Sequence, residues 1–364
     1  MKLVEVISIF ESFAPPAYQE KYDNTGLAFG NPQTDINGIL LCLDVTSDVV
    51  EEAVALEANL VISHHPVIFS PLHNLNEDDP VARIVAKAIR NNIALYSVHT
   101  NIDNIYEGVN NKICQKLGLV NLQLLSPQKG KLKKLVVFAP LSHADIIRDA
   151  MLSAGAGRIG SYDFCSYNSE GFGTFRASQG SAPFVGEIGK LHTEKEIRIE
   201  TIIPDNLIRK VISAMLKVHP YEEAAFDIYP LDNEFPLAGS GMTGETKSPL
   251  ISSDFLSLVK KTFNCGIIRH TKLNDRQIRK VAVCGGAGSF LIDDAIRANA
   301  DIMITADIKY HDFFRANERI ILADIGHYES EQFTIELFYD ILKKNFHTFA
   351  IHFSKIKGNP INYF

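Results

Sequence analysis

The chain has 364 residues, more than a single hydrophobic core typically supports, and this length predicts two domains. Hydrophobic residues make up 46% of it and charged residues 22%, as in an ordinary globular protein. A formal net charge of −7 argues against a surface that binds DNA or RNA by charge.

Nothing in the sequence suggests a membrane or a secretory route. No apolar run approaches the ~20 residues that span a bilayer, and Glu5 and Glu11 interrupt the apolar run of a signal peptide. The five cysteines are scattered and include no Cys-x-x-Cys pair, which is typical of reduced thiols. We therefore expect a cytoplasmic protein.

Helices and strands alternate in the predicted first part of the chain. Asp23 and Asn24 suit a turn and are candidates to line a site. Ser47 is the expected N-cap of a helix. Helices are predicted at 3–13, 47–57 and 81–91, and strands at 38–45, 59–63 and 93–98.

The strand at 59–63 ends in His64-His65-Pro66, where Pro66 removes a ladder donor and stops the strand. Neighbouring side chains of an extended segment point to opposite sides. Two adjacent histidines therefore suit two separate metal ions better than one shared ion. A hydrogen-bonded polar pair at a strand end is the alternative explanation.

The pattern of this first half returns near the C-terminus. Aligned without gaps, residues 39–42 meet 281–284, and residues 62–63 meet 304–305. With a shorter connection the third strands also correspond, and His99-x₃-Asp103 then falls on His327-x₃-Glu331. We predict duplicated β-α-β-α-β halves that form one α/β domain. Chance similarity between two amphipathic α/β units is the alternative.

The segment between the halves predicts an α+β domain of its own. Its order is β-α-β-β-α-β, that of a ferredoxin-like unit. The four strands of this order are predicted at 134–139, 162–167, 197–202 and 224–229, with 172–177 as a further candidate strand, and the helices at 142–152 and 204–218. The glycines of 239–244 are interpreted as a hinge that returns the chain to the first domain.

Histidines and carboxylates follow three of the predicted strands. These strands are expected to end at the same C-terminal edge of one mostly parallel sheet, where open α/β sheets bind ligands. His327 and Glu331, near the start of a helix predicted at 329–344, are spaced to share one helix face. Such a mixed set suits zinc, iron or manganese.

Other polar residues are open to two explanations. Asp307 and His311 are spaced i, i+4 beyond Thr305, although single polar residues at a helix start are commonly caps. His99 either binds metal or hydrogen-bonds a ligand of it. The glycine run at 285–288 either cradles an anion or makes a tight strand–helix turn.

Together these motifs resemble the GTP cyclohydrolase 1 type 2 homologue family, the Nif-three-like dinuclear metal proteins. The resemblance covers essentially the whole chain and rests on the motifs at 22–27, 62–66, 99–103 and 326–331. The segment His219-Pro220-Tyr221-Glu222-Glu223 resembles the hallmark of a longer subfamily with an inserted PII/CutA-like domain.

The resemblance implies a discontinuous dinuclear-metal α/β domain at 1–127 and 237–364, with a PII/CutA-like domain inserted at 128–236. It implies a toroidal homohexamer whose subunits each bind two divalent ions, Zn²⁺ foremost and Fe or Mn otherwise. The metal ligands that it implies are His64, His65, Asp103, His327 and Glu331. The chain departs from the family at Tyr22 (usually tryptophan), at Ala306 (usually glycine) and near Met242-Thr243 (usually arginine).

A metal-dependent hydrolase that acts on a nucleotide, with GTP ring opening as the reaction, is the expected function. His99 and His311 are the candidates for proton transfer. The candidates for substrate binding are Asp23, Asn24, Thr305 and Asp307. The alternative is a non-catalytic metal-binding or sensing hexamer whose inserted domain binds a regulator or a partner.

Overall fold

The computed structural model describes residues 1–76, 78–273 and 276–363. They form a mixed α/β fold with several sheets, which confirms the predicted class. The chain divides into two compact units, one formed by Met1–Pro127 with Leu237–Phe364 and the other by Gln128–Pro236. Among the described helices, none is both long and apolar enough to cross a membrane.

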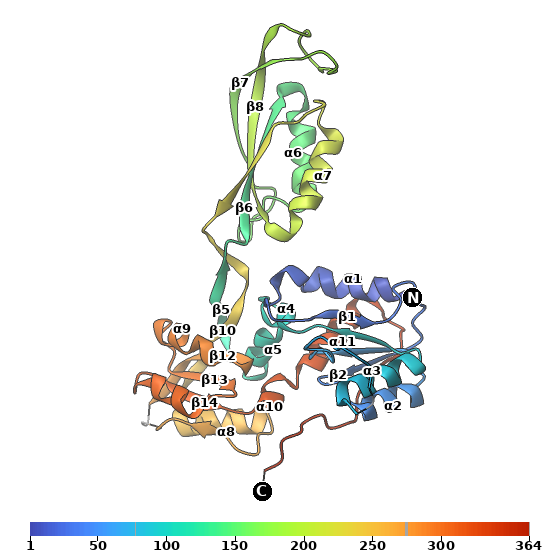
Figure 1. Cartoon of the computed structure of the whole chain (residues 1–364). Coiled ribbons are helices and arrows are strands. Elements are labelled where there is room, and N and C mark those ends of the chain that lie inside the picture. The colour runs from blue at the N-terminus through green and yellow to red at the C-terminus, as the bar shows by residue number, and fades with distance from the viewer. Residues whose placement is uncertain (77, 274–275, 364) are drawn as a thin grey trace. The chain divides into compact units, whose positions relative to one another are not determined.

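The first unit contains a five-stranded sheet in the order β1-β4-β3-β2-β15. Figure 1 labels its strands β1 and β2, with helices α1, α2, α3 and α11 around them. Strands β2, β3, β4 and β15 are parallel, and β1 is antiparallel to β4. The strands are β1 Gly26–Phe29, β2 Ile39–Cys42, β3 Leu60–Ser63, β4 Ala94–Ser97 and β15 Ile351–Phe353. The helices of this part are α1 Leu3–Phe13, α2 Ser47–Ala55, α3 Pro80–Arg90, α4 Thr100–Asp103, α5 Val109–Lys116 and α11 Thr334–Asn345.

Both faces of this sheet are covered, because every residue of β2, β3 and β4 is buried. Alternate side chains of the three strands pack with α2 and α3 in one core cluster. On the other face, the Phe10 ring of α1 contacts Tyr96 of β4 and Phe338 of α11. This packing holds the carboxyl ends of β3 and β4 side by side.

A second sheet of the first unit has the order β11-β14-β13-β12-β10-β5. Strands β12, β13 and β14 are parallel, whereas β10 and β11 are antiparallel to their neighbours β12 and β14. The strands are β5 Val120–Lys129, β10 Glu234–Ile251, β11 Arg269–His270, β12 Gln277–Ala287, β13 Ile302–Ala306 and β14 Ile321–Asp324. Its helices are α8 Ser252–Thr262, α9 Ile292–Arg297, α10 His327–Glu331 and the 3₁₀ helices η4 Ser289–Leu291 and η5 Tyr310–Ala316.

The expectation of one mostly parallel sheet is wrong. The strands before the paired histidines and before His99 belong to the first sheet, and the strand before His327 belongs to the second. Both outer edges of each parallel triple already have a partner strand, β1 and β15 in one case and β11 and β10 in the other. With these edges hydrogen-bonded, the two triples cannot join into one sheet.

Some local predictions need correction as well. The helix predicted at 329–344 is two helices, α10 and α11, and between them Phe333 packs on the ring of Phe263. Thr46, not Ser47, caps α2, because its hydroxyl accepts from the Val49 amide at 3.2 Å. No hinge forms at 239–244, since these residues lie within β10, where a Cβ on Gly239 would lie 2.4 Å from the Ser126 carbonyl oxygen.

The second unit contains a four-stranded antiparallel sheet in the order β7-β8-β6-β9. Along the chain its elements are β6 Leu132–Pro140, α6 Ala144–Ser153, β7 Tyr167–Arg176, β8 Leu191–Pro204, α7 Ile208–Val218 and β9 Phe226–Leu231. The strand predicted at 162–167 is absent from the described residues there, since β7 starts at Tyr167. Both helices pack in one apolar core with β6 and β8, through Ile147, Met215, Val137 and Ile199 among others.

Candidate metal centre

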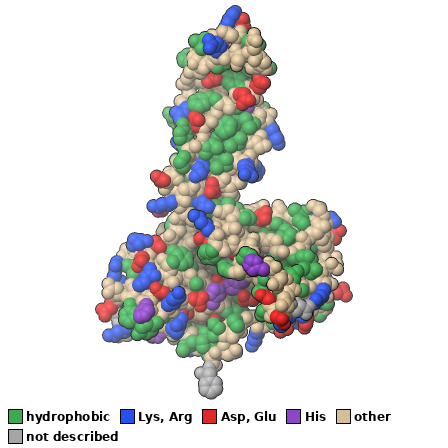
Figure 2. Space-filling model, in the orientation of Figure 1, with side chains coloured by type: hydrophobic (Ala, Val, Ile, Leu, Met, Phe, Trp, Pro, Cys, Tyr) green, Lys and Arg blue, Asp and Glu red, His purple; other side chains and the backbone are tan. Residues whose placement is uncertain are grey.

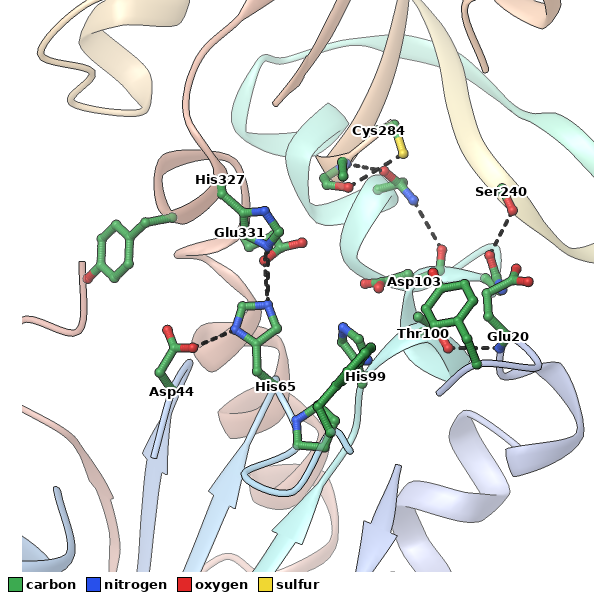
Figure 3. Close-up of a pocket in the computed structure, with 18 of the residues that line it drawn as sticks. Glu20, Asp44, His65, His99, Thr100, Asp103, Ser240, Cys284, His327 and Glu331 are labelled. Atoms are coloured by element: carbon green, nitrogen blue, oxygen red, sulfur yellow. Dashed lines mark hydrogen bonds and ion pairs between the residues drawn. The ribbon is translucent and has the colours of Figure 1, made fainter. Parts of the chain in front are cut away.

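A cavity of about 720 Å³ in the first unit collects the residues that follow β2, β3, β4 and β14. Figure 2 shows histidine side chains gathered at a hollow on this face. In Figure 3, His65, His327 and Glu331 point toward one another. His99 and Asp103 come from the neighbouring segment of the same chain, which follows β4. The carboxyl ends of strands from both sheets therefore meet at one cavity.

The paired histidines follow β3 directly, at a bend of the chain. Their backbone amides donate to the carbonyls of Cys42 (3.2 Å) and Leu43 (2.9 Å), which ties the segment to the end of β2. His64 is fully buried and contacts the Phe338 ring, whereas His65 borders the cavity. The two rings nevertheless lie close together, with centroids 4.9 Å apart, so the pair does not show the opposite orientation that strand alternation predicts.

Four imidazole rings of the site are oriented in the same way. Each Nδ1 lies within 3.0 Å of an oxygen that only accepts, so it carries the proton in the neutral ring. These pairs are His64 with the Val98 carbonyl (3.0 Å), His65 with Asp44 (2.8 Å), His99 with Asp23 (2.8 Å) and His327 with Asp307 (2.7 Å). Each Nε2 consequently offers a lone pair, the arrangement that metal-binding histidines commonly have.

The first group of ligand atoms consists of His65 Nε2, His327 Nε2 and one oxygen of Glu331. Glu331 Oε2 lies 3.1 Å from each histidine nitrogen, and the two nitrogens lie 3.3 Å apart. Around a tetrahedral ion with bonds of about 2.0 Å, ligand atoms are about 3.3 Å apart. The three side chains fit one divalent ion without rearrangement.

The second group is built from His64, Asp103 and the other oxygen of Glu331. His64 Nε2 lies 3.6 Å from Asp103 Oδ1 and 3.8 Å from Glu331 Oε1. His64 Nε2 and Asp103 Oδ1 are buried and have no hydrogen-bond partner among the described residues. Such orphaned atoms cost about 1–3 kcal/mol each, which a bound cation removes. His64 also offers its ligand atom within 4.8 Å of those of His65 and His99, a further group of donors that could hold an ion.

Burial and charge shift the pKa values of these groups in opposite directions. Burial raises the pKa of Asp103 well above its usual range, and the neighbouring Glu331 adds to this. Burial would also raise the pKa of Glu331, but the surrounding histidines outweigh it and hold that pKa well below the usual value. Burial lowers the pKa of His64. One cluster therefore contains both a carboxyl that resists ionisation and a carboxylate that resists protonation.

The pKa values of the two histidines that contact Glu331 Oε2 are raised. Burial by itself would lower their pKa values, yet hydrogen bonds to carboxylates dominate. With Asp44 and Glu331 as partners, the pKa of His65 rises to about 10. With Glu331 and Asp307 as partners, the pKa of His327 rises to about 9. In the absence of a metal ion both rings are cationic at neutral pH.

His99 lies beside this cluster and is held by a buried carboxylate. Asp23 accepts from His99 Nδ1 and, through its second oxygen, from the Thr100 amide at 3.0 Å and the Thr100 hydroxyl. Burial would raise the pKa of Asp23, but these hydrogen bonds hold it below the usual value. The His99 ring, 5.2 Å from that of His64, lines the cavity with a fixed tautomer.

The glycine run at 285–288 forms the end of β12 and its turn into η4, and not an anion cradle. Its amides already have acceptors, Asn110 for Gly285, Ser330 for Gly286 and Thr305 for Gly288, each at 2.9 Å. A Cβ on Gly286 would lie 2.3 Å from Glu331 Oε1, and the residue has φ +61°. Glycine here lets the turn pass close to Glu331.

Gly286→Ala should therefore destabilise the metal-free protein by about 2–4 kcal/mol, of which roughly 1 kcal/mol is backbone strain. Gly118→Ala is the matched control, because Gly118 has a similar φ of +68° with open space around its Cβ position. Denaturant unfolding of both variants with EDTA present measures the difference. Equal losses from the two substitutions would contradict the close contact with Glu331.

Several predicted site residues lie outside the cavity wall. Thr305 is fully buried and bonds the turn at Gly286 and Gly288, and Asn24 donates to the Ile68 carbonyl at 2.7 Å. Asp307 and Asp23 lie behind His327 and His99 as hydrogen-bond acceptors. His311 is on η5 with the rings of Tyr310 and Phe314 and is not a cavity residue.

Sequence reasoning missed other residues of the cavity. Asp44 follows β2 at the edge where His64 and His65 follow β3, and this shared position is the signal that could have revealed it. Phe69 and the segment 359–361 also line the cavity, with no motif to mark them. Asn359 of that segment donates to Glu329 at 3.1 Å.

The fold and the cluster together define a mixed α/β protein with a histidine–carboxylate site. A family model described as Duf34/NIF3 (NGG1p interacting factor 3) matches residues 1–360. The chain belongs to this family, which confirms the resemblance seen in the sequence.

Similar proteins match this chain over most of its length. A Halalkalibacterium halodurans protein called GTP cyclohydrolase 1 type 2 homolog is 41% identical over 84% of this chain and 82% of its own. The Bacillus subtilis protein of the same name is 37% identical over 89% and 87%. The crystal structure of a Bacillus cereus protein related to NIF3 has 38% identity and a TM-score of 0.86 over 100% of this chain and 99% of that chain.

Proposed function

We propose that the chain binds two divalent metal ions and uses them as a hydrolase acting on a nucleotide-related ring. Zn²⁺ is the foremost candidate ion, with Fe or Mn as alternatives. The observation that carries the proposal is Glu331, whose two oxygens face two separate groups of donor atoms. The proposed ligands are His65, His327 and Glu331 for one ion, and His64, Asp103 and Glu331 for the other.

When bound, the ions would supply an activated water near neutral pH and polarise the bond under attack. His99 is the proposed proton carrier, because its Nδ1 is held by Asp23 and its Nε2 is left to exchange a proton in the cavity. The choice of ring follows the name of the relatives, GTP cyclohydrolase 1 type 2 homolog. The opening of such a ring by water is a hydrolysis, which is the reaction proposed for this site.

Turnover by protein of defined metal content tests this function. The metal-loaded protein is offered guanine compounds and a panel of nucleotides, and products are separated by chromatography. We expect metal-dependent product that falls about 100-fold or more in His99→Asn and is unchanged in His311→Asn, the matched control outside the cavity. No metal-dependent product, or equal loss in both variants, would contradict the proposal.

Asp307 is proposed to strengthen metal binding without contacting the ion, since it holds Nδ1 of His327. Asp307→Asn should weaken the affinity for one of the two ions about 10–100-fold. Competition with a chromogenic chelator measures this. Asp312→Asn removes a carboxylate paired with Arg315 on η5 and serves as the control. An affinity that both substitutions leave unchanged would show that the contact at His327 is irrelevant.

The finer architecture is part of the same proposal. The triples β2-β3-β4 and β12-β13-β14 share order and direction, which supports an internal duplication. The order β7-β8-β6-β9 supports a ferredoxin-like, PII/CutA-like insert at 128–236. A toroidal homohexamer is proposed from the resemblance. Light scattering after size exclusion should give the mass of six 40.5-kDa chains.

A non-catalytic metal-sensing role is the second candidate. It is favoured by the second unit, which has its own apolar core and contributes no residue to the cavity. Metal binding without turnover of any tested compound would support this candidate over the hydrolase.

A further inference from the structure

The cavity wall contains acids but no fixed cation. Among the described residues that line it, none is lysine or arginine, while four are carboxylates: Glu20, Asp44, Asp103 and Glu331. Two of the carboxylates belong to the proposed metal ligands. A polyphosphate needs lysine, arginine, backbone amides or metal ions around it.

Backbone amides do not fill this gap. The glycine-rich segment at the end of β12 borders the wall, and its amides of Gly285, Gly286 and Gly288 are all hydrogen-bonded within the protein. The proposed metal ions are therefore the single strong attraction for phosphate on the described wall. If phosphate occupies them, the ring of a nucleotide lies elsewhere and cannot be opened there.

Aromatic rings, in contrast, are well supplied. Tyr22, Phe69 and Phe290 line the cavity with 66%, 52% and 59% of their surface exposed. The Phe69 ring lies 6.3 Å from that of Tyr22 and 6.4 Å from that of His99. Exposed aromatic side chains at a cavity are surfaces on which a planar base stacks.

One carboxylate of the wall suits the edge of such a ring. Glu20 Oε1 accepts from the Asn104 amide at 2.9 Å, and Asn104 is held in turn by the Ser240 hydroxyl at 2.9 Å (Figure 3). A carboxylate has room for further donors, and adjacent N–H groups of a guanine-like edge are such donors. Glu20 is not among the proposed metal ligands and is available for recognition.

From these features we infer that the substrate is a planar heterocycle without a phosphate tail, a guanine-like base or nucleoside rather than a nucleoside triphosphate. The inference rests on the proposed function and narrows its substrate class. The ring stacks on Phe69 and Tyr22 beside the metal centre, and Glu20 accepts from its N–H edge. Phosphate on the same compound weakens binding or moves the ring off the centre.

Equilibrium dialysis of radiolabelled guanosine and GTP with the metal-loaded full chain tests this directly. We expect guanosine to bind at least tenfold more tightly than GTP. Phe69→Ala should weaken guanosine binding about tenfold at unchanged metal content, and Glu20→Gln should do the same. The control is Phe314→Ala, which removes another exposed ring, one outside the cavity.

Tighter or equal binding of GTP, no binding of guanosine, or a guanosine affinity that Phe69→Ala leaves unchanged would overturn the inference. These outcomes are separate from failure of the proposed function. Metal-dependent hydrolysis with a preference for GTP would leave the hydrolase intact and remove the phosphate-free substrate. Tight guanosine binding without turnover would support the substrate class and contradict the hydrolase.

Discussion

Replacing Glu331 by glutamine should abolish binding of both metal ions at once. In this buried side chain, Oε2 lies 3.1 Å from the Nε2 atoms of His65 and His327, and Oε1 lies 3.8 Å from His64 Nε2. An amide loses the negative charge and offers a nitrogen in place of one oxygen. We expect the affinity for each ion to fall at least about a thousandfold, because a charged ligand of both sites is lost.

Metal analysis of protein dialysed against a metal buffer measures this effect. The wild-type chain should retain two ions, Glu331→Gln neither, and His327→Asn one. Glu329→Gln is the matched control, since Glu329 is also buried on α10 but is held by Asn359. Two retained ions in Glu331→Gln would show that the carboxylate does not bridge the two groups.

Metal binding at pH 7.5 should release at least about two protons per chain, from His65 and His327, in addition to any proton that Asp103 holds. Their pKa values of about 10 and about 9 mean that both are protonated at this pH without metal. An ion needs the lone pair at Nε2, so it competes with these protons. Apparent affinity should therefore rise from pH 7 toward pH 9–10 and flatten above it.

The same shifts have a consequence for the metal-free protein. A raised histidine pKa stabilises the fold fully below the unfolded pKa of about 6.5, and this stability is lost as pH rises through the folded values. The metal-free protein should thus lose stability between pH 6.5 and 10, where the metal-loaded protein does not.

Calorimetry in two buffers of different ionisation enthalpy counts the protons that metal binding releases. Binding without proton release would contradict the two cationic histidines.

The parts of the fold with strong local signals could be predicted from the sequence. Helix α1 spans Leu3–Phe13 as expected, because its apolar spacing is regular and prolines follow it. The buried strands β2, β3 and β4 lie within the predicted ranges for the same reason. What periodicity cannot show is which strands pair. Strands β15 and β10 pair with β2 and β12 at the edges of the two parallel triples. Only tertiary contacts determine this pairing.

The candidate site divides in the same way. The family resemblance implied His64, His65, Asp103, His327 and Glu331 as ligands. The structure brings these side chains together from the ends of two sheets, not from the single sheet edge that the strand pattern predicted. Asp44 and Asp307 accept from the Nδ1 atoms of His65 and His327, and these contacts join segments distant in the sequence, which local spacing does not show. Thr305 was a candidate for its polarity alone, and it serves the turn instead.

Anomalous scattering from crystals of protein purified without chelator tests the two-ion site most directly. We expect two peaks per chain at the metal absorption edge, one next to His65 and His327 and the other next to His64 and Asp103, with Glu331 between them. A single peak, or none within bonding distance of these side chains, would contradict the dinuclear centre.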